Sequence, residues 1–363
     1  MKKLITIFLC LAIAGAITLN AQDESAYKYV DASTLTITGK LFPDTPNPYH
    51  RIDTVRFKGF SKGENLQVRE SSGLAVAFRT DSPYIRVKAK FGYVSHPLNT
   101  MGVASKGFDL YIQDEGGWLW AASRVMRDGK EDEPVTVINF MDGSMHDCLL
   151  YLPLFSELHK LEIGIKDGCS IEALPNPFRH RIAVFGSSFT HGASCSRAGM
   201  AYPAQISRHT GLQLLSLGCS GNCKLQDYFA EALAAADVDA FLFDTFSNPT
   251  PEQIEERLFP FIETIQAAHP GKPLIFQRTI YRETRNFNRY NDKLQKDRIE
   301  MADNMMAEAC RKYKDVYYIE ANATAPSHET SVDGTHPNDY GYTLWAESVE
   351  KQIVKILKKY GIR

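Results

Sequence analysis

The sequence has no excess of charge of either sign. Its 363 residues include 41 Lys and Arg against 43 Asp and Glu, which gives a formal net charge of −2. Proteins whose main partner is nucleic acid or an anionic membrane surface usually carry a basic excess, and this chain has none. We therefore expect no nucleic acid and no stable membrane partner.

Long hydrophobic runs are also absent, with one exception at the amino terminus. Two lysines precede an apolar run over residues 4–19, and Asn20-Ala21-Gln22-Asp23 follows it. A basic start, a short apolar middle and a small residue at the end are typical of a secretory signal peptide. We predict a signal peptide over residues 1–21, so the mature protein is exported, either periplasmic or extracellular. The alternative is a membrane anchor, for which the run is short and its far flank acidic.

Cysteine is sparse, with 7 in the chain, and Cys10 lies in the predicted signal peptide. This scarcity excludes a small scaffold held together by disulfides. The other cysteines are Cys148, Cys169, Cys195, Cys219, Cys223 and Cys310. We hypothesise one bridge, Cys195–Cys223, between two loops of the carboxy-terminal half. The alternative is small buried thiols.

The length suggests two domains. Residues 22–173 carry short runs of alternating apolar and polar residues separated by Gly, Pro, Ser, Asn and Asp, a pattern that predicts an antiparallel β-sandwich. The predicted strands are Thr54–Phe57, Leu74–Phe78, Tyr84–Ala89, Phe108–Ile112, Val135–Ile138 and Leu158–Ile165. No helical periodicity is convincing in this half.

A Pro-rich segment, Leu174–His180, reads as a linker, and the pattern then changes to alternating strands and helices over residues 180–363. Such alternation predicts a parallel sheet covered on both faces by helices. The predicted strands are 182–185, 212–217, 240–243, 273–277 and 316–319, and the helices are 198–209, 225–236, 251–269, 291–314 and 340–359. Ligands of such sheets bind beyond the carboxyl ends of the strands.

Residues suited to ester hydrolysis follow these strands. Ser188 comes directly after the first strand, and Asp333 and His336 lie three apart in the loop after the last. A serine needs a histidine to take its proton and an acid to orient that histidine. We predict Ser188 as nucleophile, His336 as general base and then acid, and Asp333 as the residue that orients His336.

The developing oxyanion needs fixed hydrogen-bond donors. We predict the backbone N–H of Ser188, the N–H of Gly221 and the side-chain amide of Asn248, because each of these residues follows a strand at the same edge. Taken singly, each residue favours an ordinary structural role: Ser188 as a helix N-cap, and Gly221 and Asn248 as loop residues. Their order along one edge favours the catalytic reading.

In this order the residues resemble the SGNH, or GDSL, hydrolases, whose blocks carry Ser, Gly, Asn and a final Asp-x-x-His. Within that family the chain is similar to a subgroup marked by Gly186–Gly192 and Ser196–Tyr202, preceded by a β-domain with a Gly-x-Asp-Leu-Tyr motif, here Gly107–Tyr111. The resemblance covers nearly the whole mature chain. It implies a flavodoxin-like catalytic domain behind a jelly-roll-like sandwich, and O-deacetylation of polysaccharides or oligosaccharides. We expect no cofactor, and no metal because the oxyanion donors make one unnecessary.

Some residues depart from the family pattern or suggest other sites. Ser187 occupies the position where the family has Asp, a change that affects local hydrogen bonding. His191 is an alternative general base, but no acid lies three residues before it. Gly59–Gly63 has the spacing of a nucleophile elbow but reads as a turn, because no apolar helix follows. A metal site from His328, Asp333, His336 and Asp339 fits no standard zinc spacing.

Two aromatic segments are candidate sugar contacts. Trp118 and Trp120 share one face of a predicted strand, where they either stack on sugar or belong to the sandwich core. Tyr281–Tyr290 mixes aromatics with Arg, as a sugar-facing lid or a solvated loop. We expect an exported esterase acting on an acetylated glycan or small ester. The alternatives are a general carboxylesterase or lysophospholipase, and a glycan-binding protein with an inactive hydrolase half. The oligomeric state stays open.

Overall fold

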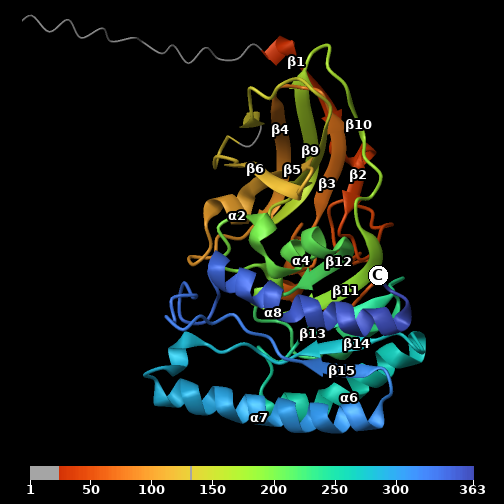
Figure 1. The fold of residues 1–363 in the computed structure, drawn as a ribbon, viewed down its shortest axis with the longest axis vertical. Coiled ribbons are helices and arrows are strands. Elements are labelled where there is room, and N and C mark those ends of the chain that lie inside the picture. Colours follow the sequence, from red (N-terminus) through yellow and green to blue (C-terminus); the bar gives the residue numbers. More distant parts are fainter. Residues whose placement is uncertain (1–23, 131–132) are drawn as a thin grey trace, which may run out of the picture.

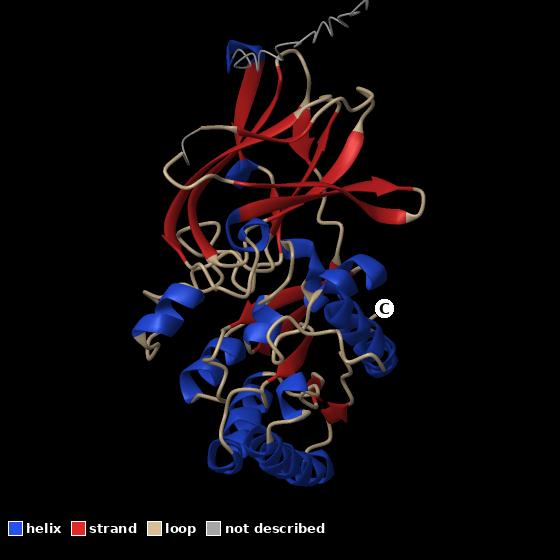
Figure 2. Ribbon diagram, turned by 90° about the vertical axis from the view of Figure 1, so that its left-hand side faces the viewer, coloured by secondary structure: helices blue, strands red, loops and turns tan. Residues whose placement is uncertain are grey.

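The computed structural model of the chain describes residues 24–130 and 133–363, so the predicted signal peptide and Cys10 lie outside the described residues. A β-sandwich part, residues 27–173, lies above an α/β part, residues 179–363, in the view of Figure 1. Figure 2, turned by 90°, shows strands dominating the upper part and helices the lower one. No helix among the described residues is long and apolar enough to cross a bilayer.

The β-sandwich part consists of two antiparallel sheets. One has the order β1-β9-β4-β7, and the other β10-β3-β8-β5-β6 with β2 paired to β3. Their bounds are β1 Tyr27–Asp31, β2 Thr36–Thr38, β3 Ala75–Thr80, β4 Ile85–Val94, β5 Gly107–Asp114, β6 Gly117–Val125, β7 Val135–Ile138, β8 His146–Tyr151, β9 Ser156–Lys166 and β10 Ile171–Ala173. Val76, Val87 and Ile163 are fully buried between the sheets, which confirms the predicted sandwich.

Two local predictions in this part are wrong. Residues 54–57, predicted as a strand, form turns. The Gly59–Gly63 segment is not simply a turn, because Ser61 caps a short helix, α1 (Lys62–Gln67). The Ser61 hydroxyl accepts from the Glu64 N–H at 3.3 Å, and the Glu64 carboxylate accepts from the Ser61 N–H at 2.7 Å. This capping box specifies a helix too short to leave an apolar periodicity in the sequence.

Other short helices also escaped prediction in this part. They are α2 (Gly102–Lys106) and the 3₁₀ turns η1 (Glu24–Ala26) and η2 (Ala32–Thr34). At five residues or fewer, none is long enough to show a helical repeat.

The α/β part contains one parallel sheet of strand order β12-β11-β13-β14-β15, which is the flavodoxin-like order 2-1-3-4-5 counted within the sheet. The strands are β11 Arg179–Gly186, β12 Leu212–Gly218, β13 Ala240–Asp244, β14 Leu274–Gln277 and β15 Val316–Ile319. The helices are α3 Ser188–His191, α4 Tyr202–Thr210, α5 Asp227–Ala234, α6 Pro251–Ala268, α7 Arg289–Lys312 and α8 Asp339–Leu357. Three 3₁₀ turns, η3 Ala198–Met200, η4 Glu283–Arg285 and η5 Lys358–Tyr360, complete it. The predicted fold class is confirmed.

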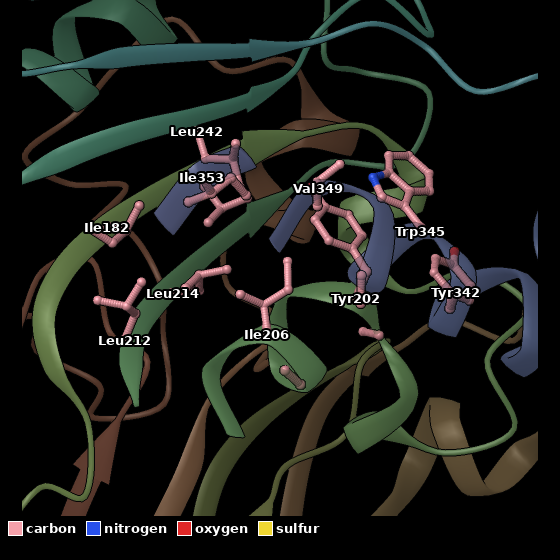
Figure 3. Packing of buried hydrophobic residues seen from close by; sticks show 14 of the residues in the cluster. Ile182, Tyr202, Ile206, Leu212, Leu214, Leu242, Tyr342, Trp345, Val349 and Ile353 are labelled. Carbon is pink, nitrogen blue, oxygen red and sulfur yellow. The ribbon is translucent and has the colours of Figure 1, made fainter. Parts of the chain in front are cut away.

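Successive strand residues point to opposite faces of this sheet, so it carries a core on each side. On one face, Ile182, Leu214 and Leu242 meet side chains of α4 and α8, among them Ile206 and Trp345 (Figure 3). The other face packs against α5, α6 and α7. Both cores are built from the apolar runs that predicted buried strands.

The two cores also decide the cysteine hypothesis. Cys195 lies in the core with α4 and α8, whereas Cys223 lies in the core on the opposite face. All six cysteines of the described residues are free thiols, so the predicted Cys195–Cys223 bridge is wrong. Burial raises the pKa of both thiols well above its usual value, and they act as small apolar side chains.

Two motifs far apart in the sequence hold the two parts together. The Asp109 carboxylate, fully buried, accepts from Arg197 Nη1 at 3.0 Å and from the Gly199 N–H at 2.8 Å. A Cβ at Gly199 would lie 2.5 Å from the Tyr111 ring, so only glycine permits this approach. The Gly107–Tyr111 and Ser196–Tyr202 motifs are therefore the two sides of one interface.

The two tryptophans lie near this interface. Trp118 is partly buried against the core that contains α4 and α8. Trp120 is 52% exposed, but its Nε1 donates to Asp109 at 3.0 Å and its ring centre lies 5.0 Å from the Arg197 guanidinium. Both rings therefore have structural contacts outside the core between the two sheets, and Trp120 keeps one face toward solvent.

Candidate active site

The predicted site residues follow β11, β12, β13 and β15 at the carboxyl edge of the parallel sheet. Ser188 begins α3 directly after β11, because Ser187 caps that helix through a hydrogen bond from the Phe189 N–H to its hydroxyl. Gly186 ends β11, and a Cβ there would lie 2.0 Å from Thr190 Oγ1. A glycine at this position therefore allows the chain to turn sharply from strand to helix and present Ser188 at the edge.

Ser188, His336 and Asp333 form a continuous chain of hydrogen bonds. Ser188 Oγ lies 2.9 Å from His336 Nε2, and His336 Nδ1 lies 2.8 Å from Asp333 Oδ2. Since a carboxylate only accepts, the proton belongs on Nδ1, and Nε2 is left free to accept from the serine hydroxyl. The structure thus brings Ser188 into contact with His336, which lies 148 positions later in the sequence, as the sequence analysis expected.

Four donors surround the Asp333 carboxylate. Its Oδ1 accepts from the backbone N–H groups of Thr335 at 2.9 Å and His336 at 2.8 Å. Its Oδ2 accepts from His336 Nδ1 and, at 2.8 Å, from the side-chain amide of Asn99. Burial alone would raise the pKa of Asp333, but these hydrogen bonds outweigh burial and hold its pKa well below the usual range. Asn99 belongs to the β-sandwich part, and the sequence analysis missed it.

The oxyanion candidates line one cavity of about 490 Å³ together with Ser188 and His336. Gly221 has φ +73°, a conformation that favours glycine, and a Cβ there would meet no atom within 4 Å. Asn248 accepts from the Cys223 N–H through Oδ1 at 3.3 Å, which leaves its NH₂ group without a bond to that loop. Gly221 and Asn248 therefore line the same cavity as Ser188.

Ser187, the departure from the family pattern, bonds a buried carboxylate beneath the site. Asp244 Oδ2 accepts from the Ser187 N–H at 3.1 Å, the Ser187 hydroxyl at 2.8 Å and Thr190 Oγ1 at 3.1 Å. Burial raises the pKa of Asp244 in spite of these hydrogen bonds. Ser187 therefore ties the turn before Ser188 to the end of β13.

His191, the alternative base, is fully buried and engaged elsewhere. Its Nε2 lies 2.8 Å from the Leu154 carbonyl and 3.0 Å from Glu70 Oε2, and its Nδ1 lies 3.2 Å from Ser220 Oγ. The ring also stacks on Phe155 with centres 4.2 Å apart. His191 thus joins the β-sandwich part to the loop that carries Gly221, and both of its ring nitrogens have partners other than Ser188.

The β-sandwich part also contacts the Gly221 loop directly. Gln67 donates to the Ser220 carbonyl and accepts from Asn222 Nδ2, each at 2.9 Å, so it bonds the residues on both sides of Gly221. Arg51, fully buried, donates to the Gly218 carbonyl at 2.9 Å. About half of the cavity wall comes from this part: Gly63, Leu66, Gln67, Glu70, Tyr93, Ser95, Pro97, Asn99 and Phe155.

The aromatic segment after β14 contributes to the cavity through Arg282. Its Nη2 donates to the Ser247 carbonyl at 2.6 Å, and its guanidinium lies 5.5 Å from the Phe189 ring centre. Burial lowers the pKa of Arg282 to about 10, so the group stays charged at neutral pH. Phe287 and Tyr290 are exposed at the surface.

The residues considered for a metal site have separate partners. His328 Nδ1 lies 2.7 Å from Glu283, and Asp339 accepts from the Ser196 N–H at 2.9 Å. Within residues 24–130 and 133–363, no three His, Cys, Asp or Glu side chains gather as a metal site would require.

Residues 179–354 match the model of the GDSL-like lipase/acylhydrolase family, and residues 27–171 match the GxDLY model, the amino terminus of SGNH hydrolase-type esterases. A crystal structure from Bacteroides ovatus, described as a GDSL-like lipase, shares 37% identity and a TM-score of 0.87, over 92% of this chain and 98% of that one. The chain belongs to the GDSL-like lipase/acylhydrolase family. It is an SGNH-type carboxylic ester hydrolase.

Two more distant structures share the whole architecture. The salicylyl-acyltransferase SsfX3 from a tetracycline biosynthetic pathway has 20% identity and a TM-score of 0.71, over 93% of this chain and 99% of that one. A family two carbohydrate esterase from Cellvibrio japonicus has 12% identity and a TM-score of 0.62, over 92% and 98%. At these identities the likeness is one of fold. None of the curated proteins matches the chain.

Proposed function

We propose that this GDSL-family hydrolase is an exported serine esterase that removes short acyl groups, chiefly acetyl, from polysaccharides or oligosaccharides. The observation that carries the proposal is the hydrogen-bonded chain from Ser188 through His336 to Asp333 at the wall of an open cavity. In this arrangement Ser188 is the nucleophile, His336 the base and Asp333 the group that holds His336 in its active tautomer.

The reaction proceeds in two steps, acylation of Ser188 and deacylation by water. Ser188 Oγ bonds to the ester carbonyl carbon while its proton passes to His336 Nε2. The tetrahedral intermediate then breaks its bond to the alcohol oxygen, which takes the proton from His336, and an acetyl-serine remains. Water, deprotonated by His336, attacks that acetyl group. The second tetrahedral intermediate breaks its bond to Ser188 Oγ, which takes the proton back from His336. Acetic acid leaves and gives its proton to the solvent.

The oxyanion formed in each step faces the donors at the sheet edge. The N–H groups of Ser188 and Gly221 and the Asn248 amide supply hydrogen bonds that strengthen as negative charge develops. The charged Arg282 guanidinium, bonded to the carbonyl just before Asn248, adds a positive potential on the same side of the cavity.

The cavity wall favours a polar alcohol and a short acyl group. It carries the polar side chains of Gln67, Glu70, Ser95, Asn99, Ser220 and Arg282, interspersed with the apolar Leu66, Pro97, Phe155 and Ala193. A long acyl chain binds tightly only where a continuous apolar channel removes its surface from water. Sugar hydroxyls, by contrast, form hydrogen bonds with polar side chains such as these. The carbohydrate esterase among the similar structures supports the same substrate class. The signal-peptide pattern of residues 1–21 supports export, which would give the enzyme access to polysaccharides outside the cytoplasm.

The test measures turnover of esters that differ in acyl chain length and in the alcohol that bears the acyl group. The mature protein and its Ser188→Ala variant are incubated with 4-nitrophenyl acetate, butyrate and decanoate, and with acetylated and chemically deacetylated xylan. We expect turnover to fall with chain length, acetate release from acetylated xylan only, and loss of both in the variant. A maximum at decanoate would favour the lysophospholipase alternative, and saturable xylan binding without acetate release would favour a binding protein.

Export is tested separately by the amino terminus of the protein recovered from outside the cytoplasm. Cleavage after Ala21 predicts Gln22 as its first residue. A full-length chain in the membrane fraction would instead indicate an anchor.

A further inference from the structure

A loop of the β-sandwich part contacts Asp333, the proposed acid of the catalytic triad. Residues 95–100 leave β4 and turn, with the Thr100 N–H donating to the Pro97 carbonyl at 3.1 Å. At the turn, Asn99 Nδ2 lies 2.8 Å from Asp333 Oδ2 and 3.1 Å from His336 Nδ1. Asn99 thus contacts two of the three proposed catalytic residues across 234 positions of sequence.

The orientation of the Asn99 amide is fixed by its neighbours. Thr100 Oγ1 accepts from the Ser194 N–H of the α/β part at 2.9 Å, and its own proton is directed to Asn99 Oδ1 at 3.2 Å. Because Oδ1 accepts from Thr100, the NH₂ end of the amide is the end that faces Asp333. The turn is therefore docked on two loops of the α/β part at once.

We propose that Asn99 is a positioning residue for ester hydrolysis, supplied by the β-sandwich part, which fixes the Asp333 carboxylate and through it the active tautomer of His336. The inference rests on the proposed roles of Ser188, His336 and Asp333. It does not depend on which alcohol carries the acyl group.

The physical basis is the convergence of two donors on one oxygen. With the proton on His336 Nδ1, both that N–H and the Asn99 amide donate to Asp333 Oδ2, so the 3.1 Å contact between the two nitrogens is not itself a hydrogen bond. Without Asn99, Oδ1 stays bonded to two backbone N–H groups, but Oδ2 keeps only the His336 ring as protein donor and opens to water on a side chain that is 35% exposed. The imidazole then loses part of its fixed orientation.

The first experiment compares Asn99→Ala, the isosteric Asn99→Asp, and Leu98→Ala as a control in the same turn, where the Leu98 side chain is fully exposed. With 4-nitrophenyl acetate we expect Asn99→Ala to lower kcat about tenfold, the loss of one hydrogen bond to a charged group, with KM within about twofold. Asn99→Asp should lose more, because it replaces the donor with a second carboxylate. Leu98→Ala should match the wild type.

A double-mutant cycle tests whether Asn99 acts through Asp333. If it does, Asn99→Ala lowers kcat in the wild type but changes it less than about twofold in the Asp333→Ala background. Equal losses in both backgrounds would overturn the inference, since they would place the effect elsewhere. So would a change in KM alone, which would make Asn99 a substrate contact, or full kcat in both Asn99 variants.

The failure of this inference is distinguishable from that of the proposed function. If Ser188→Ala is inactive and the Asn99 variants keep full kcat, only the role of Asn99 is wrong. If Ser188→Ala retains wild-type turnover, the catalytic assignment and the role of Asn99 fall together. If Ser188-dependent turnover is seen with 4-nitrophenyl acetate but not with acetylated xylan, only the glycan substrate is wrong.

Discussion

The α/β part and the β-sandwich part meet at one cavity but contribute different kinds of residues. The α/β part presents Ser188, Gly221, Asn248 and the Asp333–His336 loop after the carboxyl ends of β11, β12, β13 and β15. The β-sandwich part presents Gln67, which bonds both sides of Gly221, and Asn99, which bonds Asp333. One part holds the groups proposed to react, and the other holds those groups in place.

This division gives a graded expectation for mutations. Removing a reacting group should abolish turnover. Removing a supporting hydrogen bond should reduce turnover only by a factor that corresponds to the free energy of that one bond. Changes at the interface away from the cavity should alter stability and leave turnover nearly intact.

The largest effect is expected at the reacting groups. Ser188→Ala and His336→Ala should each lower kcat on the order of 10⁴-fold or more, since the nucleophile and its base act as a unit. Steady-state hydrolysis of 4-nitrophenyl acetate measures the loss, and an unchanged circular dichroism spectrum shows that the fold is kept. Substantial turnover in either variant would contradict the proposal that Ser188 and His336 of the α/β part carry out the reaction.

The next effect is expected at the oxyanion donors. Asn248→Ala should lower kcat by about 10²–10³-fold, the usual cost of one such donor. Asn304→Ala, an exposed asparagine on α7, is the matched control and should have no effect. A loss of less than tenfold at Asn248 would reject its role as donor.

A smaller effect is expected across the interface at Gln67. Gln67→Leu removes both hydrogen bonds that flank Gly221 and should lower kcat about five- to tenfold with little change in KM. Gln113→Leu, the same change at an exposed position of β5, controls for the substitution itself. If Gln67→Leu leaves kcat unchanged, the two Gln67 hydrogen bonds do not position the Gly221 loop for catalysis.

The smallest effect on catalysis, with a clear one on stability, is expected at Arg197. Arg197→Met leaves the buried Asp109 carboxylate without its cation and should lower the free energy of unfolding by about 2 kcal/mol, while kcat stays within about twofold. Denaturant unfolding measures the difference, with the exposed Arg56→Met as control. A large fall in kcat at unchanged stability would show that this interface is coupled to the active site.

The same division explains what the sequence could predict. Ser188, Asn248 and His336 follow apolar strand patterns, so topology alone brings them to one edge. The strand order of the α/β part is implied by the same patterns together with the family resemblance.

The supporting residues leave no such signal. Asn99 lies in an ordinary turn, Gln67 ends a helix of six residues, and the α/β-part groups that they bond lie at least 153 positions away in sequence. Their roles exist only once the two parts are docked. The Cys195–Cys223 bridge failed for a related reason, because proximity to one sheet edge does not reveal which face of the sheet each side chain enters.

The most direct test of the account is to trap the acyl-enzyme chemistry on the protein itself. The mature wild type, Ser188→Ala and His336→Ala are treated with a fluorophosphonate, and the adduct is mapped by peptide mass spectrometry. The account predicts a single rapid adduct on Ser188, none on the Ser188→Ala variant, and labelling of His336→Ala slowed by orders of magnitude. An adduct on another residue, or equally rapid labelling of Ser188 without His336, would contradict it.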